Sequence, residues 1–358
     1  MAFITGLLLI DAPASALNNA GPDEGARTDN TIAVKCIRVG RRGQTYPYVS
    51  AQAFRYWLRT KLEREGNGWR SSPVLFEKKV AYSDGNPIDY WDDDLFGYMR
   101  AESKKADAKD RGGAQGTPTS REITRAAPFR VGTLVSIAPV HVVYDFGTMA
   151  RQERDPVPYE HQFYRATLKG LLSLDLRSAG TFFAGERVGF RNLDEHRVRL
   201  AEERGLVPVV IHGQRAYRLP TPERAERVAA LLRGLADLEG GAKLTLHYTD
   251  VTPAVAFFAV TRGGNHPFQR VIGADQETGE PVLAVDALKE VLRVYRDQIL
   301  SPLYVGWAAG FHDDQRERLA ALTEEDRAGV AIHLGHPREA ILSLAEAVRW
   351  PENAAWFA

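Results

Sequence analysis

The apolar residues of this 358-residue chain switch between two spacings, and this switching constrains the fold more than any other feature of the sequence. A short apolar run predicts a strand at 2–10, an alternating pattern predicts one at 31–39, and strand-like segments follow at 131–145, 167–177, 243–248 and 254–261. Patterns with helical spacing predict helices at 50–65, 193–204, 222–238, 286–299, 313–328 and 337–349. A chain that mixes strands and helices in this order is typical of an α+β fold.

Residues 71–127 interrupt the pattern with a long stretch of low hydrophobicity, which includes the acidic run Trp91–Asp94. A hydrophilic stretch this long inside a compact domain is typical of a functional or disordered insertion. The order of the surrounding elements fits a ferredoxin-like, RRM-like core. We therefore predict three parts, namely a core of 1–70 and 128–310, a partly mobile insertion of 71–127, and a C-terminal helical segment of 311–358.

Composition describes an ordinary globular protein, with 44% hydrophobic and 26% charged residues. The single cysteine excludes a disulfide framework and every multi-cysteine metal site. The apolar stretch Met1–Ile10 loosely resembles a signal peptide, but no Lys or Arg precedes it, and a first strand explains the same residues. No run approaches the ~18 apolar residues of a membrane span. We expect a cytoplasmic protein.

Motifs of common enzymes are missing from the sequence. It contains no phosphate-binding glycine loop, no H-E-x-x-H, no G-x-S-x-G and no S-x-x-K. The pair His333 and His336 could bind a metal, but the adjoining Pro337 favours a structural turn at a helix start. Asp313 and Asp314 have the same interpretation, as carboxylates at a helix start. We therefore expect no enzyme activity, no metal and no cofactor.

Charge is balanced overall, with 46 basic and 46 acidic residues, but it is segregated along the chain. Residues 27–70 hold ten basic and three acidic residues, whereas 221–358 hold 14 basic and 20 acidic residues. Residues 100–130 hold eight basic and four acidic residues. A local basic surface attracts phosphates, so zero net charge does not exclude a nucleic-acid partner.

The helix predicted after Ser50 lies within the most basic segment. Its apolar residues share one face, while Gln52, Arg55 and Arg59 form a second stripe. Ser50 at the N-cap leaves first-turn N–H groups for an anion. The alternative is an ordinary half-buried helix with a solvated face. The adjoining strand and the basic turn with Arg41 and Arg42 favour phosphate binding.

The segment 146–158 is predicted to project as a loop with a basic tip. Met149 and Ala150 are apolar, and Arg151 and Arg154 follow them. Such a tip can wedge between bases while its arginines hold phosphates. An ordinary surface hairpin is the alternative, and composition alone does not separate the two.

Seven short motifs occur in order between residue 2 and about 310, at 17–21, 46–59, 145–151, 159–164, 240–243, 247–250 and 263–268. Their number and order resemble the backbone subunit of type I CRISPR surveillance complexes (Cascade), in the DevR autoregulator branch of type I-B systems. The resemblance implies a hand-shaped protein with an RRM-like palm, a finger insertion (71–127) and a thumb hairpin (about 146–160).

The resemblance also implies function and partners. Several copies would form a helical filament along one CRISPR guide RNA (crRNA), which would pair with target DNA in antiviral defence. Other Cascade subunits, including a large subunit and guide-end-binding subunits, would complete the complex. The sheet lacks the RRM aromatic signature, so contacts to the RNA backbone are expected, which suits any spacer sequence.

The implied RNA-binding residues fall into three sets. The RNA backbone would lie along Asn18, Asn19, Lys35, Arg38, Arg41, Arg42, Ser50, Gln52, Arg55 and Arg59. The thumb tip would be Met149, Ala150, Arg151 and Gln152, and another palm loop would be Gly264, Asn265 and His266.

Two other functions stay open. Related subunits of type III complexes cut target RNA with an acidic residue after the first strand, and Asp23, Glu24 and Asp29 occupy the comparable loop here. These acids are also ordinary turn formers beside Gly21, Pro22 and Gly25, which we favour. Direct regulation of DNA ranks last, because no helix-turn-helix pattern is present.

Overall fold

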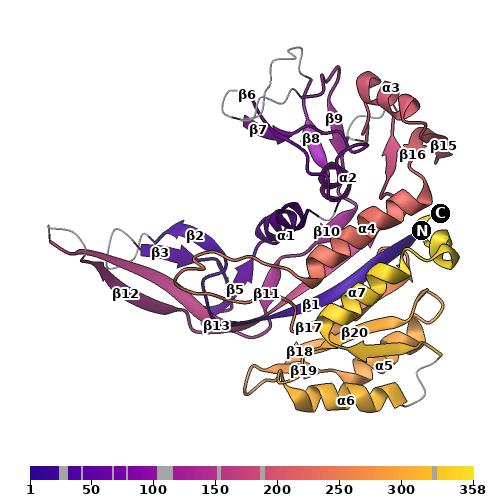
Figure 1. The fold of residues 1–358 in the computed structure, drawn as a ribbon. Helices are drawn as coiled ribbons and strands as arrows, with labels where there is room; N and C mark the ends of the chain where they lie inside the picture. The colour runs from indigo at the N-terminus through magenta and orange to yellow at the C-terminus, as the bar shows by residue number, and fades with distance from the viewer. Residues whose placement is uncertain are drawn as a thin grey trace.

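The computed structural model describes residues 1–23, 31–41, 43–66, 68–77, 80–102, 116–150, 155–185, 190–324 and 329–358. These residues form a large mixed sheet with helices on both faces, an arm that projects from the sheet, and a second lobe beside it (Figure 1). The predicted α+β class is confirmed. Within these ranges, no helix combines the length and hydropathy needed to cross a bilayer.

Three long strands form the centre of the sheet, namely β1 (Ala2–Ser15), β13 (Val157–Asp175) and β17 (Val255–Arg262). β1 lies between the other two and pairs antiparallel with both. Every residue from Ala2 to Ile10 is buried, since helices cover both faces of the sheet. A strand buried on both sides needs no polar alternation, which explains the continuous apolar run.

Alternate residues of β1 belong to different cores. Leu8 packs on the face covered by helices α1 (Ala51–Glu65), α4 (Thr221–Ala236) and α7 (Pro337–Ala347). Leu7 and Leu9 pack on the opposite face, which α5 (Val285–Val294) and α6 (Asp313–Glu324) cover. This division follows from the period of two along a strand. The helices predicted in these regions are confirmed, but the one predicted at 286–299 ends at Val294.

Shorter strands extend the sheet on both sides. Its order is β21-β20-β17-β1-β13-β11-β5-β4, and β10 also pairs with β13. The added strands are β20 (Leu303–Trp307), β21 (Ile332–Gly335), β10 (Phe129–Val131), β11 (Leu134–Ser136), β5 (Gln44–Val49) and β4 (Cys36–Val39). The segment after residue 311 therefore contributes a strand as well as helices. The short η1 (Pro267–Arg270), β18 (Ile272–Ala274), β19 (Pro281–Leu283) and η2 (Pro351–Phe357) complete this part of the chain.

The projecting arm is a hairpin of β12 (Val143–Met149) and the first half of β13, paired from Val143 with Phe163 to Met149 with Val157. At its base, β3 (Thr31–Val34) runs parallel to β13 and pairs with β2 (Asn19–Pro22). The strand predicted at 31–39 is thus divided into β3 and β4, which join different partners.

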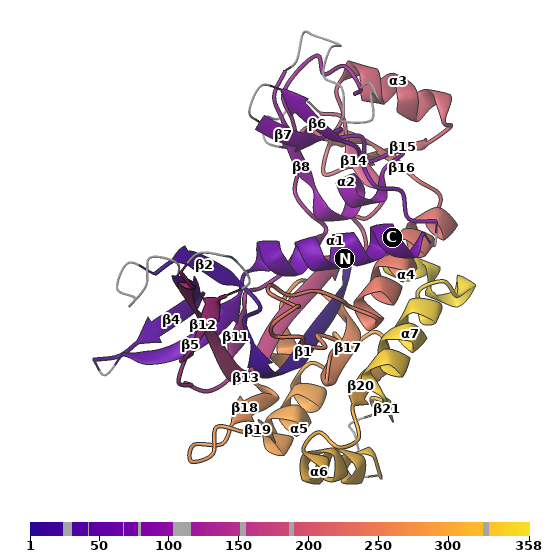
Figure 2. The ribbon, with the colours of Figure 1, turned by 60° about the vertical axis from the view of Figure 1, so that its left-hand side comes forward.

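The second lobe combines two segments that are far apart in the sequence (Figures 1 and 2). The insertion supplies β6 (Val74–Glu77), β7 (Val80–Ser83), α2 (Trp91–Phe96), β8 (Tyr98–Arg100) and β9 (Ile123–Arg125). The later segment supplies β14 (Thr181–Phe183), α3 (Glu195–Glu203), β15 (Val207–Ile211) and β16 (Gln214–Arg218). Residues 103–115, in the part predicted to be mobile, lie outside the described residues.

The two segments of this lobe are joined by polar contacts. The Thr124 N–H donates to the Arg191 carbonyl at 2.8 Å, and the Asn192 amide donates to the Thr124 carbonyl at 2.9 Å. The Tyr98 hydroxyl donates to the Asn192 carbonyl at 2.6 Å. A hydrophilic composition is therefore compatible with an ordered lobe here, because its polar groups are paired inside.

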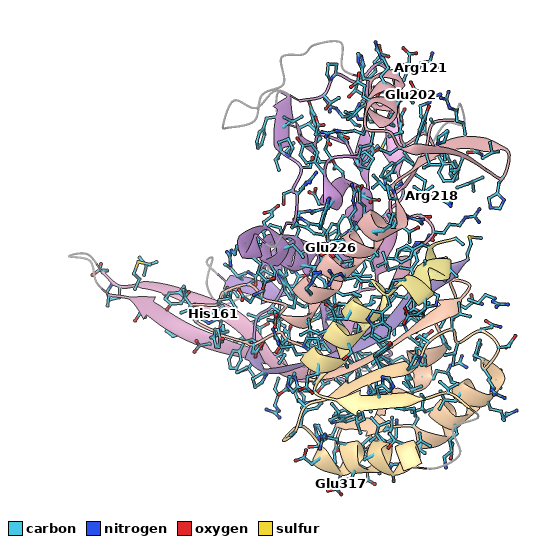
Figure 3. The ribbon with its side chains drawn as sticks, turned by 45° about the vertical axis from the view of Figure 1, so that its right-hand side comes forward. Arg121, His161, Glu202, Arg218, Glu226 and Glu317 are labelled. Carbon is cyan, nitrogen blue, oxygen red and sulfur yellow. The ribbon has the colours of Figure 1, made fainter. Side chains whose placement is uncertain are left out.

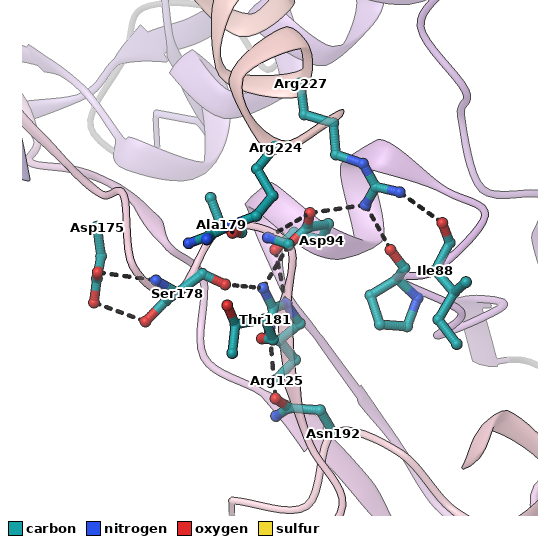
Figure 4. A network of polar contacts seen from close by, with 12 residues as sticks. Ile88, Asp94, Arg125, Asp175, Ser178, Ala179, Thr181, Asn192, Arg224 and Arg227 are labelled. Carbon is teal, nitrogen blue, oxygen red and sulfur yellow. Dashed lines mark hydrogen bonds and ion pairs between the residues drawn. The ribbon is translucent and has the colours of Figure 1, made fainter. Parts of the chain in front are cut away.

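Asp94 is the centre of a buried ionic network between this lobe and α4 (Figure 4). Its carboxylate is fully buried and accepts hydrogen bonds from Arg125, from Arg227 at 2.8 Å and from the Gly180 N–H at 3.0 Å. The acidic run 91–94, predicted as part of a hydrophilic loop, is instead a helix whose three aspartates are buried. Arginines from distant segments compensate the charge of Asp94, which no local pattern could indicate.

The strand predicted at 243–248 is wrong. Residues 241–250 form turns, and Lys243 has a positive φ of 53°. The N–H groups of Leu246 and His247 both donate to the Lys243 carbonyl, while the Ala242 N–H donates to the Leu17 carbonyl. The two turn bonds to Lys243 and the long-range bond to Leu17 replace a strand ladder.

Candidate nucleic-acid interface

Ser50 caps α1, as the sequence predicted. Its hydroxyl accepts a hydrogen bond from the Ala53 N–H at 3.3 Å, and its backbone is extended. The Ser50 N–H donates to the side-chain oxygen of Asn18 at 3.0 Å, and the Asn18 carbonyl accepts from the Lys35 N–H. Asn18 therefore fixes the start of the helix relative to the basic strand, and its side-chain oxygen is already used inside the protein.

The basic residues before α1 lie on the outer strands of the sheet. Lys35 is half-buried, whereas Arg38 on β4 and Arg41 in the following turn are exposed. Within the described residues, neither arginine forms an ion pair. Asn19 has a buried side-chain oxygen that lacks a hydrogen-bond partner among these residues. Arg42 lies outside them.

The stripe Gln52, Arg55 and Arg59 is divided by its surroundings. Gln52 is exposed, but both arginines are half-buried against Phe96, the last residue of α2. Arg55 donates to the Phe96 carbonyl, and the Arg59 Nε lies 3.7 Å from an Asp92 carboxylate oxygen. Burial and, second, the neighbouring Arg59 lower the pKa of Arg55. The second lobe thus contacts the predicted RNA-binding face directly, which the sequence did not reveal.

The described end of the projecting arm is apolar and exposed. Met149 is 57% exposed and Phe146 is 60% exposed, and Ala150 is exposed beside them. Arg151 and Gln152, predicted to complete the tip, lie outside the described residues. The apolar side chains extend along the arm, so a partner could contact more than its tip.

The loop with Gly264, Asn265 and His266 lies elsewhere. Gly264 and Asn265 are exposed, but the His266 Nε2–H donates to the Gly6 carbonyl at 2.8 Å, and burial lowers the pKa of this histidine. Gly6 is nine residues before Ser15 on β1, a separation of about 30 Å along an extended strand. The structure therefore does not bring this loop together with Asn18 and Ser50.

The sequence did not single out a histidine pair at the base of the arm, where Figure 3 labels His161. The rings of His161 and His247 lie 4.8 Å apart, and Phe163 stacks on His247 at 5.0 Å. Burial first, then the nearby Lys243, lowers the pKa of both histidines. His247 belongs to the turn segment 241–250, so the pair became visible only through the fold.

Of the three acids considered for RNA cleavage, only Asp23 lies within the described residues. Its carboxylate accepts hydrogen bonds from the Gln162 amide at 2.9 Å and from the Tyr144 hydroxyl at 3.3 Å. Both donors lie on the arm, so Asp23 connects the loop after β1 to the arm.

His336, one of the two histidines considered as metal ligands, instead caps α7. Its side chain accepts a hydrogen bond from the Arg338 N–H.

The whole fold is similar to solved structures. One is titled "CRISPR RNA-guided surveillance complex", with 15% sequence identity, a TM-score of 0.50, and coverage of 96% of this chain and 99% of that chain. Another, "CRISPR RNA-guided surveillance complex, pre-nicking", has 13% identity, a TM-score of 0.53, and coverage of 97% and 99%. At these identities the similarity concerns the fold.

A search of curated protein sequences gives no match. A family model described as "CRISPR-associated negative auto-regulator DevR/Csa2" matches residues 10–278, which is most of the chain. All seven motifs identified in the sequence lie within that range, so the family resemblance is confirmed. The chain belongs to the CRISPR-associated DevR/Csa2 family.

Proposed function

We propose that this protein is a non-catalytic scaffold that binds a CRISPR guide RNA as a backbone subunit of a type I surveillance complex. Membership of a CRISPR-associated family supports the class, and full-length similarity to chains from RNA-guided complexes supports the architecture. The observation that carries the RNA role is the pair Arg55 and Arg59, whose charge no bidentate carboxylate among the described residues satisfies.

In this proposal the palm is RRM-like. The strands β17, β1, β13 and β10 lie side by side in that order, all antiparallel. Helix α1 connects β1 to β10 in sequence, and α4 connects β13 to β17, so both crossovers lie on one face. This is the arrangement of a split β-α-β unit. The insertion 71–127 acts as the finger and the β12–β13 arm as the thumb.

The exposed and half-buried arginines of this face suit an RNA strand of any sequence. Arg38 lies on the outer strand and Arg41 in the turn that follows it, while Arg55 and Arg59 lie on the helix that begins two residues after β5. Guanidinium groups contact phosphates, which position an RNA strand without reading its bases. A subunit that accepts every spacer needs this kind of contact.

The partners follow from the same assignment. Copies of the chain would line up along the RNA in the cytoplasm, with the thumb of each copy separating short segments that pair with target DNA. A large subunit and guide-end-binding subunits would complete a type I-B-like complex. The hydrogen bonds of Asp23 to the thumb support a structural role for this carboxylate in place of catalysis.

Binding of single-stranded RNA tests the proposal. The full chain is expected to bind RNA with affinity that increases with RNA length and falls steeply with salt. Arg55→Gln with Arg59→Gln should weaken binding by at least about tenfold and reduce the slope of log K against log salt by about 1.4, or ~0.7 per phosphate contact. Arg338→Gln, an exposed arginine paired with Asp237, is the matched control.

Sequencing of RNA that co-purifies from cells with CRISPR arrays gives a second readout. Repeat-derived guide RNA is expected. A protein that binds no RNA in either experiment would overturn the proposed scaffold function.

A further inference from the structure

Phe96 forms a platform under both arginines of α1. The guanidinium carbon of Arg59 lies 4.7 Å from the centre of the Phe96 ring, and that of Arg55 lies 5.5 Å from it. The ring is only 3% exposed and packs edge-on against Trp69 at 6.2 Å and Phe129 at 5.8 Å. A ring held on two sides restricts the orientation of a guanidinium that stacks on it.

The hydrogen-bond donors of Arg59 that no described residue uses include its two terminal nitrogens, which are not fully buried. Its Nε is buried, faces Asp92 at 3.7 Å and makes no hydrogen bond with the described residues. The side chain as a whole is 35% exposed, so the exposed surface belongs to atoms other than Nε. Its terminal nitrogens make no hydrogen bond within the described part of the chain, which leaves them available to a ligand.

The two guanidinium groups also lie close to each other. Arg59 lowers the pKa of Arg55, because two neighbouring positive charges disfavour each other. Asp92 lies behind Arg59 at a distance too long for a hydrogen bond, so it compensates this repulsion only in part. An anion that accepts hydrogen bonds from both arginines would remove the repulsion.

A second stack in the same lobe shows the contrast. Arg125 lies 4.9 Å above the Phe182 ring, but its donors are used by Asp94, Asn192 and backbone carbonyls. That arginine is buried and satisfied, and it has nothing to offer a ligand. Both arginines stack on a phenylalanine ring, but the hydrogen-bond donors of Arg125 are all used inside the protein, whereas the terminal nitrogens of Arg59 make no hydrogen bond with the described residues.

We propose that Phe96 is a positioning residue, which holds Arg55 and Arg59 as a joint site for phosphates of the RNA backbone. In this way the finger insertion would determine how tightly α1 of the palm binds RNA, although Phe96 itself would not contact the RNA. This inference rests on the proposed RNA-binding function and adds the residue that organises the site.

A double-mutant cycle tests this role. Phe96→Leu removes the flat ring but keeps an apolar side chain and the carbonyl that accepts from Arg55. We expect about fivefold weaker binding of a single-stranded RNA probe in 50 mM salt, the scale of one cation–π contact. In the Arg55→Gln, Arg59→Gln background the same change should alter binding less than twofold, because no arginine remains to be positioned.

Two variants control for damage to the lobe. Phe182→Leu removes the other stacked ring and should leave RNA affinity unchanged, whereas Phe96→Tyr keeps the ring and should bind like the original protein. Phe96→Met replaces Phe96→Leu in the cycle if the latter does not fold, since its flexible side chain fills the same space.

If Phe96→Leu weakens RNA binding equally in the original protein and in the Arg55→Gln, Arg59→Gln variant, the inference about Phe96 is wrong while the proposed RNA-binding function stands. The same holds if Phe182→Leu weakens RNA binding as much as Phe96→Leu does. Absence of salt-sensitive RNA binding by the unaltered protein would overturn the proposed function and the inference with it.

Discussion

Two groups of arginines in this chain stack on aromatic rings, and they differ in what satisfies their donors. Around Asp94, Arg125 and Arg227 are buried and saturated with hydrogen bonds. On α1, Arg55 and Arg59 are partly exposed, and within the described part of the chain only Arg59 has an ion pair, a long one to Asp92. The residue type is the same in both places. The neighbours decide whether an arginine holds the fold together or remains available to a phosphate.

The comparison also explains why charge counts along the chain are ambiguous. The count of eight basic and four acidic residues at 100–130 gives this segment a basic character. Yet Arg100 and Arg125 in this segment are buried and paired, with Asp84 and Asp94 respectively. Within 27–70, by contrast, Arg38 and Arg41 are exposed. The net charge of a segment indicates a binding surface only when the residues in buried ion pairs are left out of the count.

The largest effect is expected where a buried charge loses its partner. Asp94→Ala would leave Arg125 and Arg227 without a compensating carboxylate, and it should lower the free energy of unfolding by about 3–5 kcal/mol. Chemical denaturation measures this. Glu195→Gln, which removes an exposed ion pair with Arg121, is the control and should cost less than ~1 kcal/mol. A loss below 1 kcal/mol for Asp94→Ala would contradict the structural role of the network.

Asp92 gives a pH-dependent test at the boundary between the two groups. Burial first, then the charge of Asp93, raises the pKa of Asp92 from 3.8 to about 7. The folded state therefore binds this proton more tightly than the unfolded state, and stability should fall as pH rises from about 4 to 7.

Asp92→Asn should remove the contribution of this carboxylate to the fall in stability with pH. At pH 8 it should stabilise the protein by on the order of 2 kcal/mol. Thermal denaturation at pH 5 and pH 8 measures it, and Glu195→Gln should show no such difference between the two pH values. A variant that is less stable than the original protein at pH 8 would show that the Arg59 ion pair outweighs the burial of the carboxylate.

The exposed arginines should affect binding without affecting stability. Arg38→Gln and Arg41→Gln are each expected to weaken RNA binding about two- to fourfold and to reduce the salt slope by ~0.7, with unchanged melting temperature. Titrations at several salt concentrations measure both quantities. An unchanged salt slope would remove these residues from the interface.

The smallest effect concerns the histidine pair at the base of the arm. Because the pKa values of His161 and His247 are lowered in the fold, their contribution to stability is present above about pH 6.5 and is lost as pH falls. Asp145 lies 3.2 Å from His161 and opposes the effect, whereas Lys243 adds to it. Hydrogen exchange should show faster opening of the arm at pH 5 than at pH 7. His161→Gln should reduce this difference, and equal protection at both pH values would contradict it.

Local chemistry made much of the fold predictable. Ser50 begins a helix because its hydroxyl accepts the Ala53 N–H, and this signal needs only four consecutive residues. The helices near 222–238 and 337–349 were found the same way, since Pro222 and Pro337 occupy first-turn positions. The strand at 243–248 was wrong because Gly240, Gly241 and the bond to Leu17 favour turns over a ladder.

The sequence by itself determined the α+β class, the positions of most helices, though not of α2, the segregation of charge and the family to which the chain belongs. Only the tertiary structure decided which arginines are free, because Asp94 and its partners come from segments up to 133 residues apart. The same holds for the platform under Arg55 and Arg59, where Phe96 lies 41 residues after Arg55. Electrostatic and stacking energies depend on distance in space, and residue spacing along the chain carries no information about it.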